Sequence, residues 1–279
     1  MSEWFFTSDL HGQFSLYEQV AEIAARHRPP AIVIGGDLCP HAGDAAGPAR
    51  QRVFLQGFLV EFARRVREAS PSTRLLLMMG NDDWAANVDV LETGDGVLWH
   101  YLHERRVEVS SVPVVGLSWV PITPFRIKDW ERWDDGRDES PVRLEGFVSG
   151  GGGLREHVFD PRRRTPTIAQ ALEIVAGLAD PAHAILVSHS PPHGTLCDVV
   201  HARVHVGSRA LRRHVEAHRP PLVLCGHIHE SPRVTSSWRD RLGPTVVVNP
   251  GQFGAARLSG VWFDPADPAG TLRHHALEA

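Results

Sequence analysis

The sequence has 279 residues, of which 42% are hydrophobic, and a formal net charge of -4 at pH 7. A chain of this length and composition can bury a substantial core, and we expect one domain over residues 1–279. The slightly acidic balance excludes a generally basic surface, so the charge argues against nucleic acid as a partner. The cysteines, Cys39, Cys197 and Cys225, are too widely spaced to predict a disulfide framework or a thiolate zinc site.

The first residues enter an apolar run at once, without a basic leader or an apolar stretch of signal length. No segment approaches the roughly 20 consecutive apolar residues that a membrane-spanning helix needs. Unpaired cysteines are typical of a reducing compartment. We therefore expect a soluble, cytoplasmic protein with no membrane partner.

Short apolar runs recur along the chain and predict largely buried strands. Segments between them carry apolar residues at three- and four-residue spacing, which predicts helices. The expected strands are 4–6, 31–34, 75–79, 112–117, 184–187, 222–224 and 246–248, and the expected helices are 14–27, 48–69, 168–178 and 208–218. The alternation of strands and helices indicates an α/β fold. We favour two sheets with helices outside, but periodicity alone does not distinguish this arrangement from one open sheet.

Residues 121–165 differ from the rest of the chain because they are rich in charge, tryptophan and glycine. We interpret them as a long insertion within the domain. Trp130 and Trp133 look exposed in this charged setting, which favours an active-site cover, since long loops in compact domains are often functional. The alternative is an ordinary surface excursion with both tryptophans packed underneath.

The number of histidines, 17, is unusually high, and polar side chains, mostly acids and histidines, stand directly after five of the expected strands. Because the carboxyl ends of strands in α/β sheets line the crevice where ligands bind, these side chains can converge. Glycines beside them allow the backbone to turn sharply and to approach an ion or a phosphate closely. The residues in question are Asp9, His11, Asp37, Asn81, His189, His227 and His229.

Imidazole nitrogens, carboxylates and one amide oxygen, with no thiolate, suit divalent ions such as Mn, Fe, Co, Ni or Zn. Seven ligands are too many for one tetrahedral ion, whereas two ions that share a carboxylate would use them all. Two ions about 3.5–4 Å apart clamp the attacking and leaving oxygens in phosphoryl displacement. A single Asp-x-His or His-x-His is more often a surface feature, so the prediction depends on the ordered combination.

That combination resembles the calcineurin-like metallophosphoesterase superfamily over residues 4 to about 263. The motifs are Asp9-Leu10-His11, Gly36-Asp37, Gly80-Asn81, Ser188-His189, Gly226-His227-Ile228-His229 and Asn249-Pro250-Gly251. The resemblance implies a four-layer α/β/β/α sandwich and a dinuclear centre, with a hydroxide between the ions attacking phosphorus in line with the leaving alcohol. It implies that one ion binds Asp9, His11, Asp37 and His229, and that the other binds Asp37, Asn81, His189 and His227.

One position departs from the family pattern, in which a histidine commonly follows Gly-Asn. This chain has Asp82 there. An ionised aspartate repels phosphate, so Asp82 is protonated, or supports another ligand, or leaves proton donation to another group. His193 is the natural substitute, although a solvent-facing loop role is its alternative. We therefore predict Asp82 and His193 as catalytic residues.

The segment from His189 to Asp198 resembles the His-x-Pro-Pro-x-Gly-x-x-Asp segment of phosphodiesterase-like members, which favours small phosphodiesters, including nucleotides, as substrates. A phosphomonoesterase or protein phosphatase of the same fold is the alternative. A catalytically silent metal-binding scaffold is a rival from another class, but such proteins usually lack part of the ligand set. A metal-dependent amidohydrolase on a (β/α)8 barrel also places ligands at strand ends, but the order of motifs argues against it.

Overall fold

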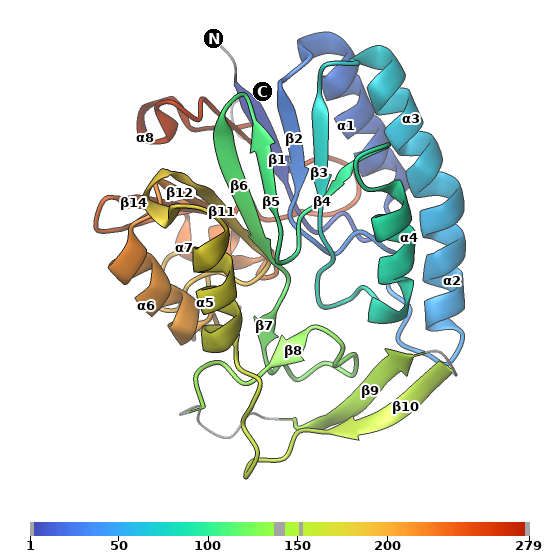
Figure 1. Cartoon of the computed structure of the whole chain (residues 1–279), viewed down its shortest axis with the longest axis vertical. Helices are drawn as coiled ribbons and strands as arrows, with labels where there is room; N and C mark the ends of the chain where they lie inside the picture. Colours follow the sequence, from blue (N-terminus) through green and yellow to red (C-terminus); the bar gives the residue numbers. More distant parts are fainter. Residues whose placement is uncertain (1–2, 137–142, 151–152, 277–279) are drawn as a thin grey trace.

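Two six-stranded sheets form the centre of the molecule in this computed structural model, which describes residues 3–136, 143–150 and 153–276 (Figure 1). The first sheet has the order β16 (Arg273–His274), β15 (Val261–Phe263), β1 (Trp4–Thr7), β2 (Ala31–Ile34), β3 (Arg74–Leu77) and β4 (His100–Tyr101). The second has the order β13 (Arg239–Leu242), β14 (Thr245–Val248), β12 (Leu222–Leu224), β11 (Ile185–Ser188), β6 (Val112–Leu117) and β5 (Arg106–Val109). Both sheets are mixed. The first has antiparallel pairings at one edge only, at β15 and β16, whereas the second has an antiparallel strand at each edge.

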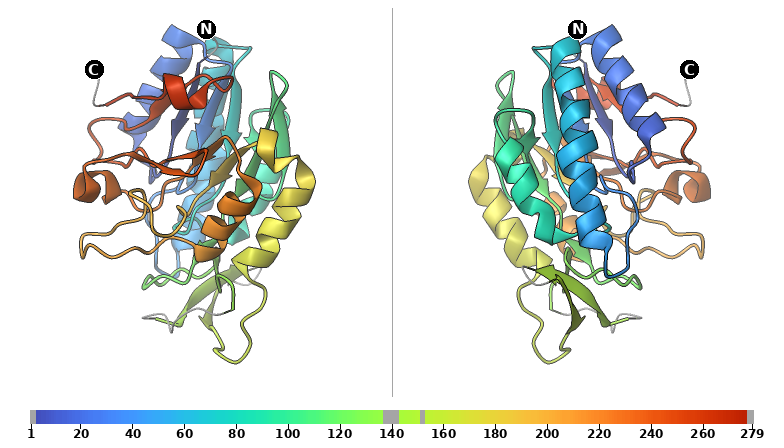
Figure 2. Two further views of the ribbon diagram at one scale, coloured as in Figure 1. Left: turned by 90° about the vertical axis from the view of Figure 1, so that its left-hand side faces the viewer. Right: turned by 90° about the vertical axis from the view of Figure 1, so that its right-hand side faces the viewer.

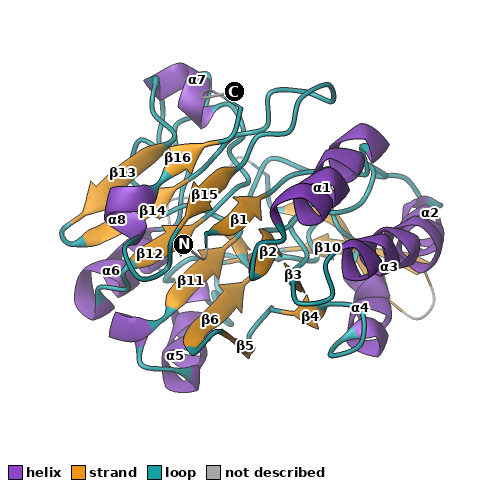
Figure 3. Ribbon diagram, turned by 90° about the horizontal axis from the view of Figure 1, so that it is seen from above, coloured by secondary structure: helices purple, strands orange, loops and turns teal. Residues whose placement is uncertain are grey.

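Helices cover the outer face of each sheet, as Figure 3 shows from above. The first sheet is covered by α1 (Phe14–His27), α2 (Gly47–Phe54), the π-helical turn η1 (Leu55–Leu59), α3 (Val60–Ala69) and α4 (Val88–Gly94), which follows the short η2 (Ala85–Asn87). The second is covered by α5 (Ile168–Leu178) and α6 (Arg209–His218). The remaining short helices are η3 (Pro181–His183), α7 (Ser231–Thr235) and α8 (Pro268–Thr271).

The alternation of side chains along each strand creates the layers. In β1, Phe6 points into the core between the sheets, whereas Phe5 packs under the helices of the first sheet. In β11, Val187 faces the core between the sheets and Leu186 faces α5 and α6. Because both faces of such a strand are buried, side chains on both faces are apolar. These strands therefore appear in the sequence as continuous apolar runs. The four-layer α/β/β/α sandwich predicted from the sequence is confirmed.

Each predicted element lies within about two residues of an observed one, but the strands β4, β5, β13, β15 and β16 were not predicted. The expected helix 48–69 is interrupted by the π-helical turn Leu55–Leu59. Ser208 lies before α6 and caps it, since its Oγ accepts the amide N–H of Leu211. In the described part of the chain no helix combines the length and apolar character that crossing a bilayer requires.

The segment that the sequence marks as an insertion forms two small sheets of its own. β7 (Val120–Pro121) pairs with β8 (Glu131–Arg132), and β9 (Glu145–Gly150) pairs with β10 (Gly153–Val158) as a hairpin. The hairpin extends from one end of the sandwich, beyond the ends of the central strands (Figures 1 and 2). Residues 137–142 and 151–152 of the expected insertion lie outside the described residues.

The expectation that Trp130 and Trp133 are exposed is wrong, because their side chains are only 3% and 2% exposed. Trp130 packs against the rings of His103 and Trp119. Its Nε1 donates to the carbonyl oxygen of Asp83 at 2.8 Å. The charged sequence neighbourhood conceals this burial, because the charged residues Lys128, Glu131 and Asp134 are themselves buried beside the indoles.

His103 provides a test of the packing around this segment. Its ring lies between Trp119 and Trp130, its Nδ1 accepts the amide N–H of Ser118 at 3.0 Å, and burial lowers its pKa to about 3. A histidine held neutral in the folded state contributes stability that is fully present above its unfolded pKa and is lost as the pH falls towards the folded pKa. We expect the wild type to lose about 2 kcal/mol of unfolding free energy relative to His103→Gln when the pH falls from 7 to 5.

Urea unfolding of both proteins across this pH range measures the difference. Glutamine keeps an acceptor for Ser118 but does not titrate, so acid sensitivity shared by both proteins cancels. A difference that stays constant with pH would contradict the buried, neutral state of His103.

Candidate metal centre

The seven candidate ligands come from five loops at the carboxyl ends of strands in both sheets. β1, β2 and β3 belong to the first sheet, and β11 and β12 belong to the second. Because these strands run in parallel within each sheet, their following loops meet at one end of the sandwich. Asp9 and His11 follow β1, Asp37 follows β2, Asn81 follows β3, His189 follows β11, and His227 and His229 follow β12.

Four of these residues form a compact group, with one donor atom from each lying within 4.8 Å of the others: Asp9, His11, Asp37 and His229. The Nε2 atoms of His11 and His229 are 3.3 Å apart. The Nε2 of His11 lies 3.7 Å from Asp37 Oδ2, and the Nε2 of His229 lies 3.7 Å from Asp9 Oδ1. Two carboxylates and two imidazoles that face one another in this way fit a divalent cation.

A second group meets the first at Asp37. The Nε2 of His189 lies 3.4 Å from Asp37 Oδ2 and 3.1 Å from Asn81 Oδ1. The ring of His227 lies 5.2 Å from the ring of His189. Asp37 thus stands between two sets of donors, as a carboxylate shared by two ions would.

The protein orients the ring of His189 from the opposite side. Its Nδ1 donates to the carbonyl oxygen of Gly35 at 2.9 Å, so its Nε2 faces Asn81 and Asp37. A backbone carbonyl that fixes the far nitrogen of a histidine is the usual outer support of a metal ligand. Asp9 is held in a comparable way, since its carboxylate accepts the amide N–H of His227 at 3.0 Å.

The protonation states of Asp37, His189 and His227 are compatible with a bound cation. Burial opposes the charge of Asp37, but His189 more than offsets this and holds the pKa of the Asp37 carboxyl well below its usual range. Burial also works against charge on His189, yet the Asp37 carboxylate raises the pKa of His189 to about 10. Burial lowers the pKa of His227 to about 3, which leaves its ring neutral and able to coordinate. A divalent cation at this position would replace the proton of His189 as the counter-charge to Asp37.

Four candidate ligands have the left-handed backbone conformation, which residues with a Cβ rarely adopt. The φ angles are +60° for Asp9, +44° for His11, +50° for Asp37 and +65° for His227. Each such residue costs about 1–3 kcal/mol, and strain of this kind clusters at functional sites. Hydrogen bonds between the loops hold the conformation, including the amide N–H of His11 to the Asp37 carbonyl at 2.8 Å.

Two glycines leave room for the ligands. A Cβ on Gly80 would lie 2.3 Å from Asp37 Oδ1 and 2.5 Å from His189 Nε2. A Cβ on Gly226 would lie 2.2 Å from Asp9 Oδ2. No side chain fits at these distances. The two positions therefore require glycine, because ligand atoms lie too close to the backbone for a Cβ.

A cavity of about 430 Å³ opens onto this centre. Asp37, Asn81, His227 and His229 line it, together with Asp82. The other lining residues, which sequence analysis did not identify, are His41, Ala42, Gly43, Phe125, Arg126, Ile127, Val200, Ile228 and Glu230. His41 could have been identified from the sequence, because it is a histidine on the same loop as Asp37.

The two predicted catalytic residues lie in different surroundings. Asp82 lines the cavity, donates its amide N–H to Asp37 Oδ1 at 2.8 Å, and places Oδ2 2.6 Å from His41 Nδ1. The His41 ring stacks on that of His11 at 4.1 Å. The ring of His193 lies 5.7 Å from that of His205, and His193 is not among the residues described as lining the cavity.

Asp83 is a structural residue of the centre that sequence analysis also missed. Its buried carboxylate accepts amide N–H groups from Leu38, Cys39 and Gly80 at 2.8–3.0 Å. Burial raises its pKa to about 7 in spite of these bonds. It thereby ties the loop that carries Asp37 to the loop that carries Asn81.

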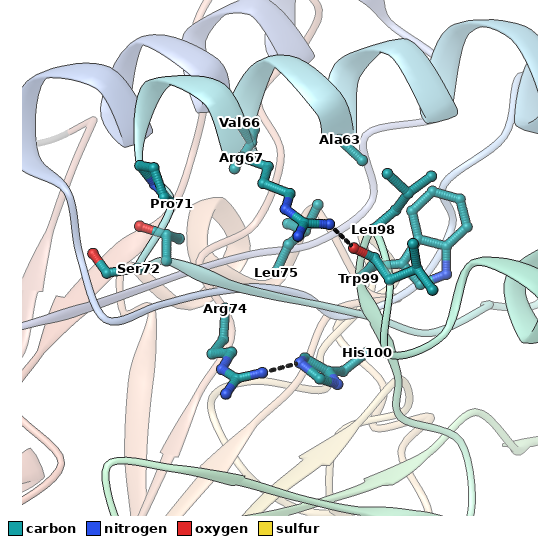
Figure 4. A pocket seen from close by; sticks show the side chains of 13 residues that line it. Ala63, Val66, Arg67, Pro71, Ser72, Arg74, Leu75, Leu98, Trp99 and His100 are labelled. Atoms are coloured by element: carbon teal, nitrogen blue, oxygen red, sulfur yellow. Dashed lines mark hydrogen bonds between the residues drawn. The ribbon is translucent and has the colours of Figure 1, made fainter.

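A second cavity, of about 300 Å³, lies at the amino end of β3, away from the ligands (Figure 4). Arg67 donates to the carbonyl oxygen of Val97, and Arg74 lies 3.0 Å from His100 Nε2. None of the seven candidate ligands is among the described residues that line it.

Comparisons with solved structures show a similar fold. A crystal structure of TT1561 from Thermus thermophilus has a TM-score of 0.58 at 18% identity, covering 98% of this chain and 97% of that chain. Another solved structure has a TM-score of 0.66 at 14% identity over 98% of both chains. These likenesses concern the fold.

An uncharacterised protein of Methanocaldococcus jannaschii is 42% identical over 69 residues. The match covers 23% of this chain and 29% of that protein, so the aligned part is less than a third of the curated relative. The model of the calcineurin-like phosphoesterase family matches residues 5–231, a span that contains all seven candidate ligands. The chain therefore belongs to the calcineurin-like phosphoesterase family.

Proposed function

We propose that this chain is a phosphodiesterase that hydrolyses small phosphodiesters at a centre of two divalent metal ions. The observation that carries the proposal is the position of Asp37, whose buried carboxylate lies 3.7 Å from His11 Nε2 and 3.4 Å from His189 Nε2. Membership of a phosphoesterase family supports hydrolysis of a phosphate ester. The choice of diesters rests on the His189 to Asp198 segment.

Each ion has four ligands in this proposal, and Asp37 belongs to both sets. One set is Asp9, His11, Asp37 and His229, and the other is Asp37, Asn81, His189 and His227. Nitrogen and oxygen donors without a thiolate suit Mn, Fe, Co, Ni or Zn. When bound, such ions lower the pKa of water and offset the charge on phosphoryl oxygens.

The chain itself contributes orientation and a hydrogen-bonding group at the cavity. Asp82 holds His41 through the 2.6 Å contact, and His41 lines the cavity. The imidazole of His41 can hydrogen-bond a substrate oxygen there, with Asp82 as its positioning residue. His193 stays the alternative proposal for this role, but its position near His205 supports it less well.

Asp37→Ala should lower metal-dependent hydrolysis by more than about a hundredfold, since loss even of a supporting partner of a metal ligand costs 10–100-fold. The test uses chelator-treated protein re-supplied with Mn, Co, Ni, Zn or Mg, with bis-p-nitrophenyl phosphate and p-nitrophenyl phosphate as substrates. Asp89→Ala is the matched control, because Asp89 is an exposed residue paired with Arg52.

The proposal predicts faster turnover of the diester than of the monoester. Hydrolysis of the monoester alone would favour a phosphomonoesterase. Full activity in Asp37→Ala would contradict the ligand assignment.

His41→Ala should lower kcat/KM for the diester by roughly tenfold, because a hydrogen bond to a charged group is worth about 1.5–3 kcal/mol. The bound metal should be unchanged by elemental analysis, which separates this role from ligation. His193→Ala is the comparison, and we expect it to lower kcat/KM for the diester by less than about threefold. A large loss in His193→Ala with none in His41→Ala would transfer the role to His193.

A further inference from the structure

We propose that the turn from Thr123 to Glu131 forms a binding site for the organic group of the substrate, and that it selects phosphodiesters with an aromatic group. The inference rests on the proposed function and adds the class of diester. The turn belongs to the segment interpreted from the sequence as an insertion.

The cavity lined by Asp37, Asn81, His227 and His229 also has an apolar wall. Phe125 and Ile127 of the turn line it, together with Val200 and Ile228. Phe125 is 52% exposed, which leaves a large part of its ring accessible. A single exposed aromatic residue is common on protein surfaces, but here it borders the same cavity as Asp37, where a substrate phosphate would bind in the proposed function.

A buried ion pair fixes the shape of the turn. The ammonium of Lys128 donates to Glu131 Oε2 and to the carbonyl oxygen of Thr123, both at 2.7 Å. The side chains of Lys128 and Glu131 are 0% exposed. Glu131 Oε2 also accepts the amide N–H of Thr123 at 3.1 Å. A buried pair adds little net stability but can enforce one conformation, in this case the one that presents Phe125 and Ile127.

The turn is also joined to the loop that carries Asn81. Asp129 Oδ2 accepts the amide N–H of Ala85 at 2.9 Å, and Trp130 Nε1 donates to the carbonyl oxygen of Asp83 at 2.8 Å. On the other side, Asp129 Oδ1 accepts the amide N–H of Ser149 in β9. The wall therefore keeps a fixed position relative to the candidate ligands.

The chemistry of the wall indicates its ligand. A phosphodiester has a second organic group that stays on phosphorus while the first departs, and the apolar wall can pack against it. An aromatic group gains most, because it can stack on Phe125. Arg126 lines the same cavity, and its positive charge can attract an anionic ester.

The test compares phenyl p-nitrophenyl phosphate with methyl p-nitrophenyl phosphate. The two diesters share charge and leaving group and differ only in the group that remains. We expect the wild type to have a higher kcat/KM for the phenyl ester, and Phe125→Ala to lower the phenyl-to-methyl ratio by roughly tenfold. Val158→Ala is the control, because Val158 is a 64% exposed apolar residue of the same segment and does not line the cavity in the described structure. A ratio unchanged by Phe125→Ala would overturn the inference.

A binding measurement separates this inference from the proposed function. Calorimetry with Mn-loaded protein should show diphenyl phosphate binding about tenfold more tightly than dimethyl phosphate, with the preference lost in Phe125→Ala. This result would support the subsite even if neither p-nitrophenyl ester were hydrolysed, in which case only the proposed activity would fail. Equal binding of both phosphates by the wild type would overturn the subsite while leaving hydrolysis of the methyl ester as evidence for the centre.

Discussion

The carboxylate of Asp37 is buried where the loops of the two sheets meet, and most of the surrounding structure serves to keep it there. Asp37 is only 1% exposed. A buried carboxylate is unfavourable unless it is paired and hydrogen-bonded. Here His11 and His189 flank it, and the amide of Asp82 donates to it. A core that served only packing would not surround a buried carboxylate with several polar groups in this way.

The two sheets contribute unequal parts to this arrangement. The first sheet supplies both carboxylates and the amide, whereas the second supplies most of the imidazoles. The packed core between the sheets therefore sets the distance between acids and histidines. The left-handed backbone at several ligands adds cost, which the large buried core is able to offset. The packing that stabilises the sandwich therefore also fixes the geometry of the centre.

Much of the fold could be predicted from the sequence because its signals are local. A strand buried on both faces appears as an apolar run, and α1 and α5 were predicted at their observed bounds by apolar spacing. The ligands were predicted as a set because each follows such a run and has glycine nearby. The structure brings donor atoms of Asp9, His11, Asp37 and His229 within 4.8 Å of one another, close enough to bind one cation.

The remaining features depend on contacts between distant segments. Asp83 acts through amide groups of Leu38 and Cys39, and nothing in its own neighbourhood indicates this. The burial of Trp130 depends on His103 and Trp119, so a charged local sequence led to the wrong expectation. Phe125 borders the cavity only because the turn is held against the Asn81 loop, which no periodicity encodes.

The proposed reaction depends on two cations that share the carboxylate of Asp37. Anomalous diffraction from crystals of the protein grown with Mn would locate these cations. We expect two anomalous peaks about 3.5–4 Å apart, with Asp37 oxygens between them and the other six ligands divided between the peaks. A single peak, or peaks that lie away from Asp37, would rule out a shared carboxylate.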